Sequence, residues 1–181
     1  PKIERAAGIG AGTMGGGIPM SFAHAGIPVT IIEMGEEQLN RGLGVMKKNY
    51  DATAARRGLK PEDVTKPIAL VTRKVGLESA SDADLIIEAV FETMAIKKEV
   101  FTKLDAIAKS GAVLASNTSY LNIDEIASVT KRPQDVLGMH FFSPANVMKL
   151  CEIVRGCRTA ADVLGTAVAI AANISSKENL Q

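Results

Sequence analysis

The chain has 181 residues, of which 46% are apolar and 23% are charged, and its 21 basic and 20 acidic side chains leave a formal net charge of +1. These values fit one folded globular domain and exclude extensive disorder. The balanced charge and the absence of Trp exclude a typical nucleic-acid-binding surface. Because the sequence has neither a signal-peptide pattern nor an apolar run of about 18 residues, we expect a cytoplasmic protein that does not insert into membranes.

Several features of other protein classes are missing from the sequence. There is no internal repeat, low-complexity tract or linker, so we expect no domain boundary inside the chain. Cys151 and Cys157 are too few for a disulfide-rich scaffold and lack the spacing of a metal site. We therefore interpret both cysteines as reduced structural thiols and expect no bound metal.

Short β-branched runs alternate with longer helical patterns along the chain. A strand-like segment comes first and leads into a glycine-rich turn, since six of the sixteen glycines fall within the first 17 residues. The elements predicted after it are a strand over 28–33, a helix over 36–57, a strand over 84–90, a helix over 97–109, a strand over 112–116, a short helix over 123–129 with Asn122 as its N-cap, extended segments over 136–142 and 147–154, and a terminal helix over 159–174. This alternation predicts an α/β fold with a mostly parallel sheet and flanking helices.

The glycine-rich turn contains a complete G-x-G-x-x-G pattern at residues 10–15 (GAGTMG), between a predicted strand and a predicted helix. In Rossmann-type doubly wound folds the first glycine, here Gly10, allows a tight turn. The second, Gly12, lets a pyrophosphate approach the backbone, and the third, Gly15, lets helix and strand pack closely. Pro19 lies past the first turn of the predicted helix, where its ring would crowd the Gly15 carbonyl, so we expect a kink there.

An acidic residue at a suitable distance strengthens the dinucleotide interpretation. Thr13 and Met14 lie at the predicted helix N-terminus, where N–H groups and the helix dipole favour a phosphate. Glu33 ends the second strand, 23 residues after Gly10, and would accept hydrogen bonds from the adenosine ribose. Together these features favour dinucleotide binding over the alternative, a glycine-rich turn without a ligand.

A second group of candidate site residues begins at the end of a later strand, at the edge of a parallel sheet where ligands bind. They occupy 115–119 (ASNTS), 138–144 (GMHFFSP) and 148–152 (MKLCE). His140 is the strongest candidate, because it lies where a strand should leave the core and Glu152 lies on the following segment. The alternative for a lone histidine is a hydrogen-bonded structural residue, and we assign His24 on the first predicted helix to that class.

Four motifs carry a family resemblance that extends from about Ile3 to Thr159. They are GAGTMGGGI, IIEAVFE with a following IKK, ASNTSYLNI and GMHFFSPANVMKLCEIVRG. With these motifs the sequence resembles the NAD-binding domain of the 3-hydroxyacyl-CoA dehydrogenases, including the dehydrogenase part of multifunctional fatty-acid β-oxidation enzymes. The resemblance implies a Rossmann-type fold, NAD as the cofactor, and reversible oxidation of an (S)-3-hydroxyacyl-CoA to the 3-ketoacyl-CoA.

The resemblance also implies roles for individual residues. Ser119 would hydrogen-bond the 3-oxygen of the substrate, His140 would be the general base, and Glu152 would orient and polarise its imidazole. The positions that match family residues lining the nicotinamide half of the cofactor cleft are Ala89, Glu92, Lys97 and Asn117.

Two pairs of these implied contacts have a simpler alternative. Glu92 and Lys97 could form a solvated charge pair that touches no cofactor. Asn49 and Arg56 match positions that the family uses for the CoA moiety and lie seven residues apart on one helical face. Their alternative is to face water, as most polar residues on long helices do.

The chain departs from the family pattern at three positions and at its end. Gly8 stands where a β-branched residue is common, Pro19 where Ala is usual, and Ser143 where many relatives carry Asn. The family continues into a helical domain that supplies a further active-site Asn, much of the acyl-CoA tunnel and the dimer interface, whereas this chain stops at Gln181.

From this resemblance we expect an NAD-binding domain over residues 1–177, and a dimer for the full-length protein with an acyl-CoA as substrate. The last four residues, 178–181 (ENLQ), are like an incomplete protease-tag sequence, so we expect a tag remnant there. Two other functions stay open. One is an NAD-linked dehydrogenase of a 3-hydroxy acid without CoA. The other is a cofactor-binding fragment without useful catalysis of its own.

Overall fold

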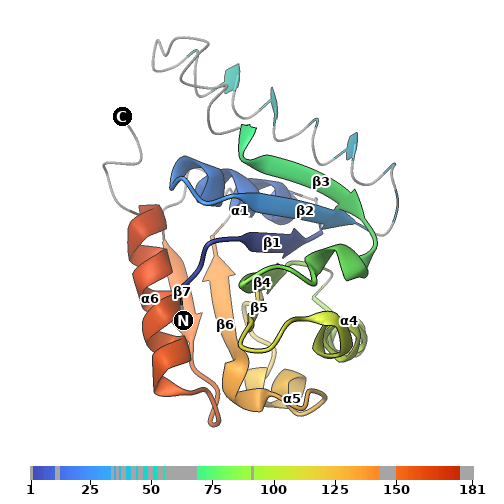
Figure 1. Ribbon diagram of the computed structural model, residues 1–181, viewed down its shortest axis with the longest axis vertical. Helices are drawn as coiled ribbons and strands as arrows, with labels where there is room; N and C mark the ends of the chain where they lie inside the picture. Colours follow the sequence, from blue (N-terminus) through green and yellow to red (C-terminus); the bar gives the residue numbers. More distant parts are fainter. Residues whose placement is uncertain are drawn as a thin grey trace.

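One seven-stranded sheet forms the centre of the described structure (Figure 1). The computed structural model describes residues 2–10, 13–33, 35, 37, 40–41, 44, 47–48, 51–52, 55, 69–90, 92–142 and 150–175, with only the backbone for residues 13–16. The strands are β1 (Ala6–Ile9), β2 (Val29–Glu33), β3 (Val71–Val75), β4 (Leu85–Glu88), β5 (Val113–Ser116), β6 (Val136–Phe141) and β7 (Cys151–Val154). The helices are α1 (Thr13–His24), α4 (Met94–Ile107), α5 (Ile123–Ala127) and α6 (Ala161–Ser175), with short 3-10 helices η1 (Leu77–Ala80) and η2 (Pro133–Asp135).

The order of the strands is that of a doubly wound sheet. It runs β3-β2-β1-β4-β5-β6-β7, and all neighbours are parallel except β6 and β7, which are antiparallel. The chain starts inside the sheet, builds outward to β3, and then returns past β1 to β4. The predicted Rossmann-type α/β fold is therefore confirmed. Its order reverses between β1 and β4, and this is the position at which such folds bind ligands.

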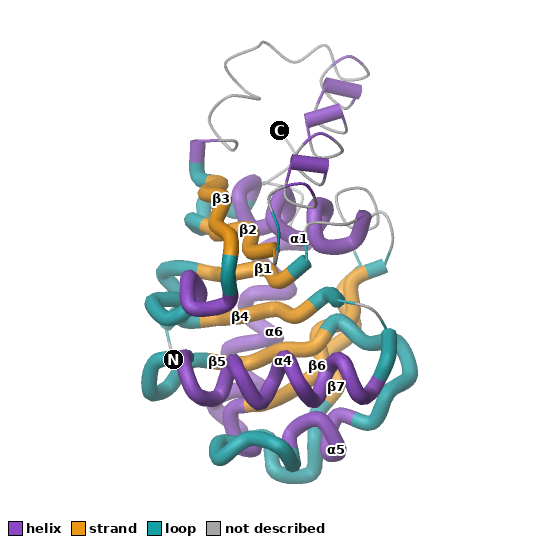
Figure 2. Tube along the Cα trace, turned by 90° about the vertical axis from the view of Figure 1, so that its right-hand side faces the viewer, coloured by secondary structure: helices purple, strands orange, loops and turns teal. Residues whose placement is uncertain are grey.

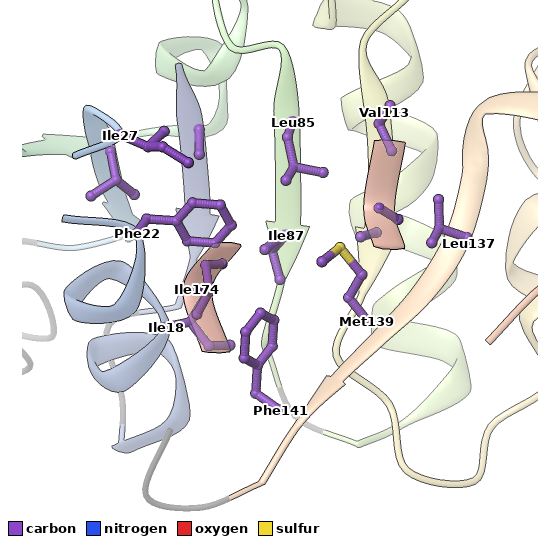
Figure 3. Close-up of a cluster of buried hydrophobic side chains, with 14 of the residues drawn as sticks. Ile18, Phe22, Ile27, Leu85, Ile87, Val113, Leu137, Met139, Phe141 and Ile174 are labelled. Atoms are coloured by element: carbon purple, nitrogen blue, oxygen red, sulfur yellow. The ribbon is translucent and has the colours of Figure 1, made fainter. Parts of the chain in front are cut away.

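Helices cover both faces of the sheet, and each face has its own apolar cluster. On one face α1 and α6 pack on the strands, with Phe22 and Ile174 in the cluster (Figures 1 and 3). On the other face η1, α4 and α5 pack on the strands through side chains such as Phe101 and Leu104. In Figure 2, α4 lies in front of the sheet. Burial on both faces explains why β1 (AAGI) and β5 (VLAS) contain no charged residue.

Most predicted elements are confirmed with small shifts at their ends. Asn122 caps α5 as expected, because its side chain accepts hydrogen bonds from the N–H groups of Asp124 at 2.9 Å and Glu125 at 3.3 Å. The described positions within 36–57 are helical. The segment predicted over 147–154 contains β7, and residues 147–149 lie outside the described part. The sequence did not predict β3, since four of its five residues (VTRKV) are exposed at the sheet edge and give no apolar pattern.

Two departures from the family pattern, Gly8 and Pro19, are neighbours in space. A Cβ added at Gly8, in β1, would lie 3.5 Å from Cγ of Pro19. Helix α1 nevertheless continues from Thr13 to His24 with Pro19 inside it, so the expected kink does not end the helix. The absence of a side chain at Gly8 therefore leaves room for the proline ring.

We expect Gly8→Val to lower the free energy of unfolding by about 1–3 kcal/mol, because its methyl groups would press into the Pro19 ring. Gly8→Ala is the matched control, since its Cβ would make an ordinary contact and should change stability by about 1 kcal/mol or less. Urea denaturation of both variants measures the difference. Equal midpoints would show that Pro19 does not restrict position 8.

The carboxylate of Asp84, just before β4, holds the chain at the start of β1. Its Oδ2 accepts hydrogen bonds from the N–H groups of Glu4 and Arg5, both at 2.9 Å, and its Oδ1 pairs with Lys109. Burial raises the pKa of this carboxyl, but the hydrogen bonds from Lys109 and the two amides outweigh that effect and hold the pKa below its ordinary value. The ionised form therefore stabilises this end of the sheet.

Asp84→Asn should lower the free energy of unfolding at neutral pH by about 1 kcal/mol, a modest loss because solvent screens the ion pair. Since the folded pKa lies below the ordinary 3.8, the contribution is fully present above that value and is lost as the pH falls through the folded pKa. Urea unfolding of both proteins from about pH 7 to about pH 2.5 tests this. The difference should shrink in acid, and a constant difference would exclude a role for the charge.

Candidate active site

The turn after β1 brings the chain into contact with the end of β4. Gly10 has a φ of +99°, a backbone conformation that favours glycine, and its N–H donates to the Ile32 carbonyl at 2.9 Å. A Cβ at Gly10 would lie 2.9 Å from the carbonyl oxygen of Ala89, closer than real Cβ atoms approach. Glycine is therefore needed at the first motif position for its conformation and for space.

Other parts of the dinucleotide motif surround this turn. Helix α1 begins at Thr13, so its N-terminal N–H groups and positive dipole end come directly after the turn. Glu33 is the half-buried last residue of β2, the strand beside β1. Gly12 lies outside the described residues, and only the helical backbone is described for Thr13, Met14 and Gly15. The glycine turn and the start of α1 lie where the strand order reverses, and Glu33 ends the strand beside β1. These features fit NAD, whose pyrophosphate would lie at the helix and whose ribose would lie at Glu33.

A buried carboxylate, Glu88, ends β4 next to this turn. The side chains of Glu88 and Lys97 are both 0% exposed, and Lys97 Nζ lies 2.7 Å from Glu88 Oε2. The same oxygen accepts the Val90 N–H at 2.8 Å, and Oε1 accepts the Ser116 hydroxyl at 2.6 Å. The alternative interpretation of Lys97 as half of a solvated pair with Glu92 is therefore wrong, because the Lys97 charge is buried against Glu88.

Sequence reasoning did not select Glu88 as a site residue. A signal existed, since Glu88 is the one charged residue in the strand LIIE and a lysine follows nine positions later on a helix. A buried charge needs a partner of opposite charge or several hydrogen bonds, so a carboxylate in such a strand indicates a built polar cluster. The contact of Lys97 with the cofactor stays a prediction.

The segments after β4 and β5 are joined through Glu92. Its Oε1 accepts a hydrogen bond from the hydroxyl of Thr118, which is buried. Its Oε2 accepts from the N–H of Ser119 at 3.2 Å and from the Ser119 hydroxyl at 3.5 Å. The hydroxyl of Tyr120, a residue that is 73% exposed, reaches the Glu92 carbonyl at 3.5 Å. The exposed hydroxyl of Ser119 thus lies on a segment that the Glu92 side chain holds in place.

His140 and Glu152 face each other across β6 and β7. They are register partners in the antiparallel pair, which places their Cβ atoms on one face of the sheet about 5 Å apart. His140 is half-buried, with its ring centroid 4.6 Å from that of Phe142, and Glu152 is exposed. Asn117 Oδ1 accepts the N–H of Phe141 at 2.8 Å and so fixes the peptide that follows His140.

The selected residues that the structure describes gather at one edge of the sheet. Gly10, Glu33, Ala89 and Asn117 lie at the carboxyl ends of β1, β2, β4 and β5, and His140 is the penultimate residue of β6. The site therefore combines a dinucleotide turn, an imidazole opposite a carboxylate, and an exposed hydroxyl. An imidazole with a carboxylate at the facing position is the kind of group that acts as a general base, so this arrangement suits proton transfer beside a bound dinucleotide.

Some selected residues contribute no visible geometry. Asn49 and Arg56, like the tail 178–181, lie outside the described residues, so their assignments stay predictions.

Cys151 and Cys157 are free thiols, and burial, helped by the charge of Glu152, raises the pKa of Cys151 to about 12. Among the described residues no group of His, Cys, Asp and Glu could hold a metal ion. The same part of the chain contains no helix with the length and apolar character to cross a membrane.

Comparisons with known proteins agree with this geometry. The family model described as "3-hydroxyacyl-CoA dehydrogenase, NAD binding domain" matches residues 5–180. The peroxisomal bifunctional enzyme of Danio rerio is 43% identical over 169 residues, which cover 93% of this chain and 23% of that protein. The probable 3-hydroxybutyryl-CoA dehydrogenase of Bacillus subtilis is 42% identical over 171 residues, which cover 94% of this chain and 59% of that protein.

A solved structure shows the same similarity in three dimensions. The crystal structure of FadB2 from M. tuberculosis aligns with a TM-score of 0.92 at 37% identity, over 97% of this chain and 62% of that one. This chain thus spans less than two thirds of the length of these relatives. The match to the family model nevertheless extends over nearly the whole chain, so the chain belongs to the 3-hydroxyacyl-CoA dehydrogenase family and corresponds to its NAD-binding domain.

Proposed function

We propose that this chain binds NAD and carries the general base of an enzyme that interconverts an (S)-3-hydroxyacyl-CoA and a 3-ketoacyl-CoA in fatty-acid β-oxidation. The observation that carries the proposal is the pairing of His140 with Glu152 at the same sheet edge as the Gly10 turn. The names of the relatives support the substrate class, since the B. subtilis protein is a probable 3-hydroxybutyryl-CoA dehydrogenase.

In the oxidation direction each residue has one task. His140 takes the proton of the substrate 3-hydroxyl, and Glu152 stabilises the imidazolium that forms. Ser119 donates a hydrogen bond to the 3-oxygen, from a segment that Glu92 holds through the Ser119 N–H. When bound, NAD supplies the hydride acceptor for the C3 hydrogen. The proton and the hydride therefore leave the same carbinol group toward different acceptors, and the ketone results.

The remaining assignments belong to the same proposal. Ala89, Glu92, Lys97 and Asn117 would surround the nicotinamide half of the cofactor, and Asn49 with Arg56 would bind the CoA moiety. The matched relatives are longer than this chain, and their additional length would supply the walls of the acyl pocket and a dimer interface. We keep the expectations of an NAD-binding domain over 1–177, a dimeric full-length protein and a cytoplasmic location as parts of this proposal.

The chain should bind NADH more tightly than NADPH by roughly tenfold or more, equivalent to about 1.4 kcal/mol. The reason is that Glu33 would meet the 2′-phosphate of NADPH, which carries about −1.5 to −2 charge, as a like charge. Fluorescence titration measures both dissociation constants. Glu33→Gln should narrow the difference, whereas Glu99→Gln, at an exposed acid on α4, should leave it unchanged. Equal constants for the wild-type chain would contradict the role of Glu33.

His140→Gln should lower the rate of acetoacetyl-CoA reduction by NADH roughly 10²- to 10⁴-fold, the range for losing a general base, with NADH affinity nearly unchanged. The rate is measured in a fusion of this chain to the remaining length of the B. subtilis relative, and the affinity on the chain itself. The chain alone should be on the order of 10²-fold slower than the fusion, because substrate positioning is incomplete.

Each rival function has its own outcome in this assay. Near-normal turnover by His140→Gln would make the histidine structural and refute the mechanism. Equal rates for the chain and the fusion would refute the need for further positioning walls. Reduction of free acetoacetate as efficient as that of the CoA thioester would favour a dehydrogenase of CoA-free acids. NADH binding without turnover in the fusion would favour a domain that only binds the cofactor.

A further inference from the structure

We propose that Glu88 is a positioning residue for the cofactor, because its buried carboxylate fixes the Ala89–Val90 peptide against the glycine turn before NAD binds. This inference rests on the NAD-binding role of the domain. It concerns a residue to which the proposed mechanism gives no task.

The peptide unit between Ala89 and Val90 is held from both sides. Its carbonyl oxygen packs so closely on the glycine turn that a Cβ at Gly10 would lie only 2.9 Å away. Its N–H donates to Glu88 Oε2 at 2.8 Å. The preceding N–H, that of Ala89, donates to the Ile9 carbonyl at 2.9 Å as the last ladder bond between β4 and β1. The orientation of this peptide is thus determined where the two strands separate.

The carboxylate that holds this peptide is itself immobilised. Lys97 Nζ lies 2.7 Å from its Oε2, and the Ser116 hydroxyl donates to its Oε1 at 2.6 Å. Both charged side chains are 0% exposed. The donors come from α4 and β5, so one carboxylate on β4 joins three elements. Glu88 therefore presents a rigid acceptor to Val90.

Stability alone does not account for this cluster. Replacing a buried ion pair by apolar groups of similar size is often neutral or stabilising, so the presence of the pair is weak evidence for a role in stability. A peptide at the end of a strand lacks a ladder partner on at least one side, so it could rotate. Rotation would turn its N–H toward the glycine turn and its carbonyl away from it. An acceptor that prevents this rotation removes an ordering cost that NAD binding would otherwise carry.

Two double variants separate the positioning effect of the Glu88 side chain from the effect of its charge and from any contact that Lys97 makes with NAD. Glu88→Gln with Lys97→Met removes both charges but keeps a side-chain oxygen for the Val90 N–H. Glu88→Leu with Lys97→Met removes both charges and that oxygen at similar side-chain volume. Because Lys97→Met is common to both, any direct contact of Lys97 with NAD cancels in the comparison.

The readout is the dissociation constant for NADH, measured by fluorescence titration on samples that circular dichroism shows to be folded at that temperature. The variant with Leu should bind NADH roughly tenfold or more weakly than the variant with Gln, equivalent to about 1.4 kcal/mol. Since both samples are folded, a difference in global stability cannot produce this result. Ser128→Ala is the control, because the Ser128 hydroxyl donates to the Glu125 carbonyl and takes no part in this cluster, and its NADH dissociation constant should stay within about threefold of wild type.

The wild-type chain provides a second test that does not depend on how the variants fold. In the free protein the Val90 amide should exchange as slowly as the amide of Ile87 within β4, and NADH should slow both by the same factor. A Val90 amide that becomes protected only when NADH is bound would overturn the proposal.

Different results would overturn the positioning role of Glu88 and the cofactor role of the domain. Equal NADH affinity for the two double variants would overturn the positioning role of Glu88 and leave the NAD site intact. A folded wild-type chain that binds no NADH would overturn the cofactor role and this inference together.

Discussion

The contact between the Ala89 carbonyl and Gly10 determines the geometry of the site. Strands β1 and β4 run side by side in parallel, and the chain leaves their ends toward opposite faces of the sheet, to α1 and to α4. A ligand fits where these connections diverge. A single methyl group at Gly10 would overlap the carbonyl, so the closeness of the segment after β4 requires glycine here, as does the positive φ of the turn.

Side chains continue the pairing of the sheet where its backbone ladder stops. The parallel register of β5 and β6 ends at Ser116 and Gly138, but Asn117 Oδ1 accepts the N–H of Phe141 beyond that point. Glu92 does the same for the segment after β5, through the Ser119 N–H. Polar side chains at this edge therefore act as substitutes for backbone acceptors. They hold in place the segments that carry Ser119 and His140.

The sequence predicted those features that depend on residues close together in the chain. The alternation of β-branched and helical runs indicated the doubly wound sheet, and Asn122 indicated the start of α5 because capping involves only the next three residues. The exposed strand β3 and the burial of Lys97 did not follow from the sequence. Lys97 lies on α4, where the sequence pattern favours a lysine that faces solvent. Its partner Glu88 lies on β4, and only the tertiary fold brings the two side chains into contact. The facing of His140 and Glu152 likewise depends on the register of β7, since they lie 12 residues apart in the chain.

The cofactor side and the base side of the site share one series of hydrogen bonds. The Val90 N–H donates to the side chain of Glu88, whose backbone carbonyl accepts the Asn117 N–H at 2.8 Å, and the Asn117 side chain accepts the N–H of Phe141 at 2.8 Å. The series runs from the peptide beside the glycine turn to the peptide that follows His140. In the proposed reaction the hydride leaves C3 and the proton leaves the hydroxyl oxygen on C3, so both acceptors must lie within about 3–3.5 Å of their atoms. Because strands β4, β5 and β6 carry this series, the sheet itself sets the position of the peptide beside the glycine turn relative to the peptide that follows His140, and under the proposed mechanism substrate binding would not have to assemble it.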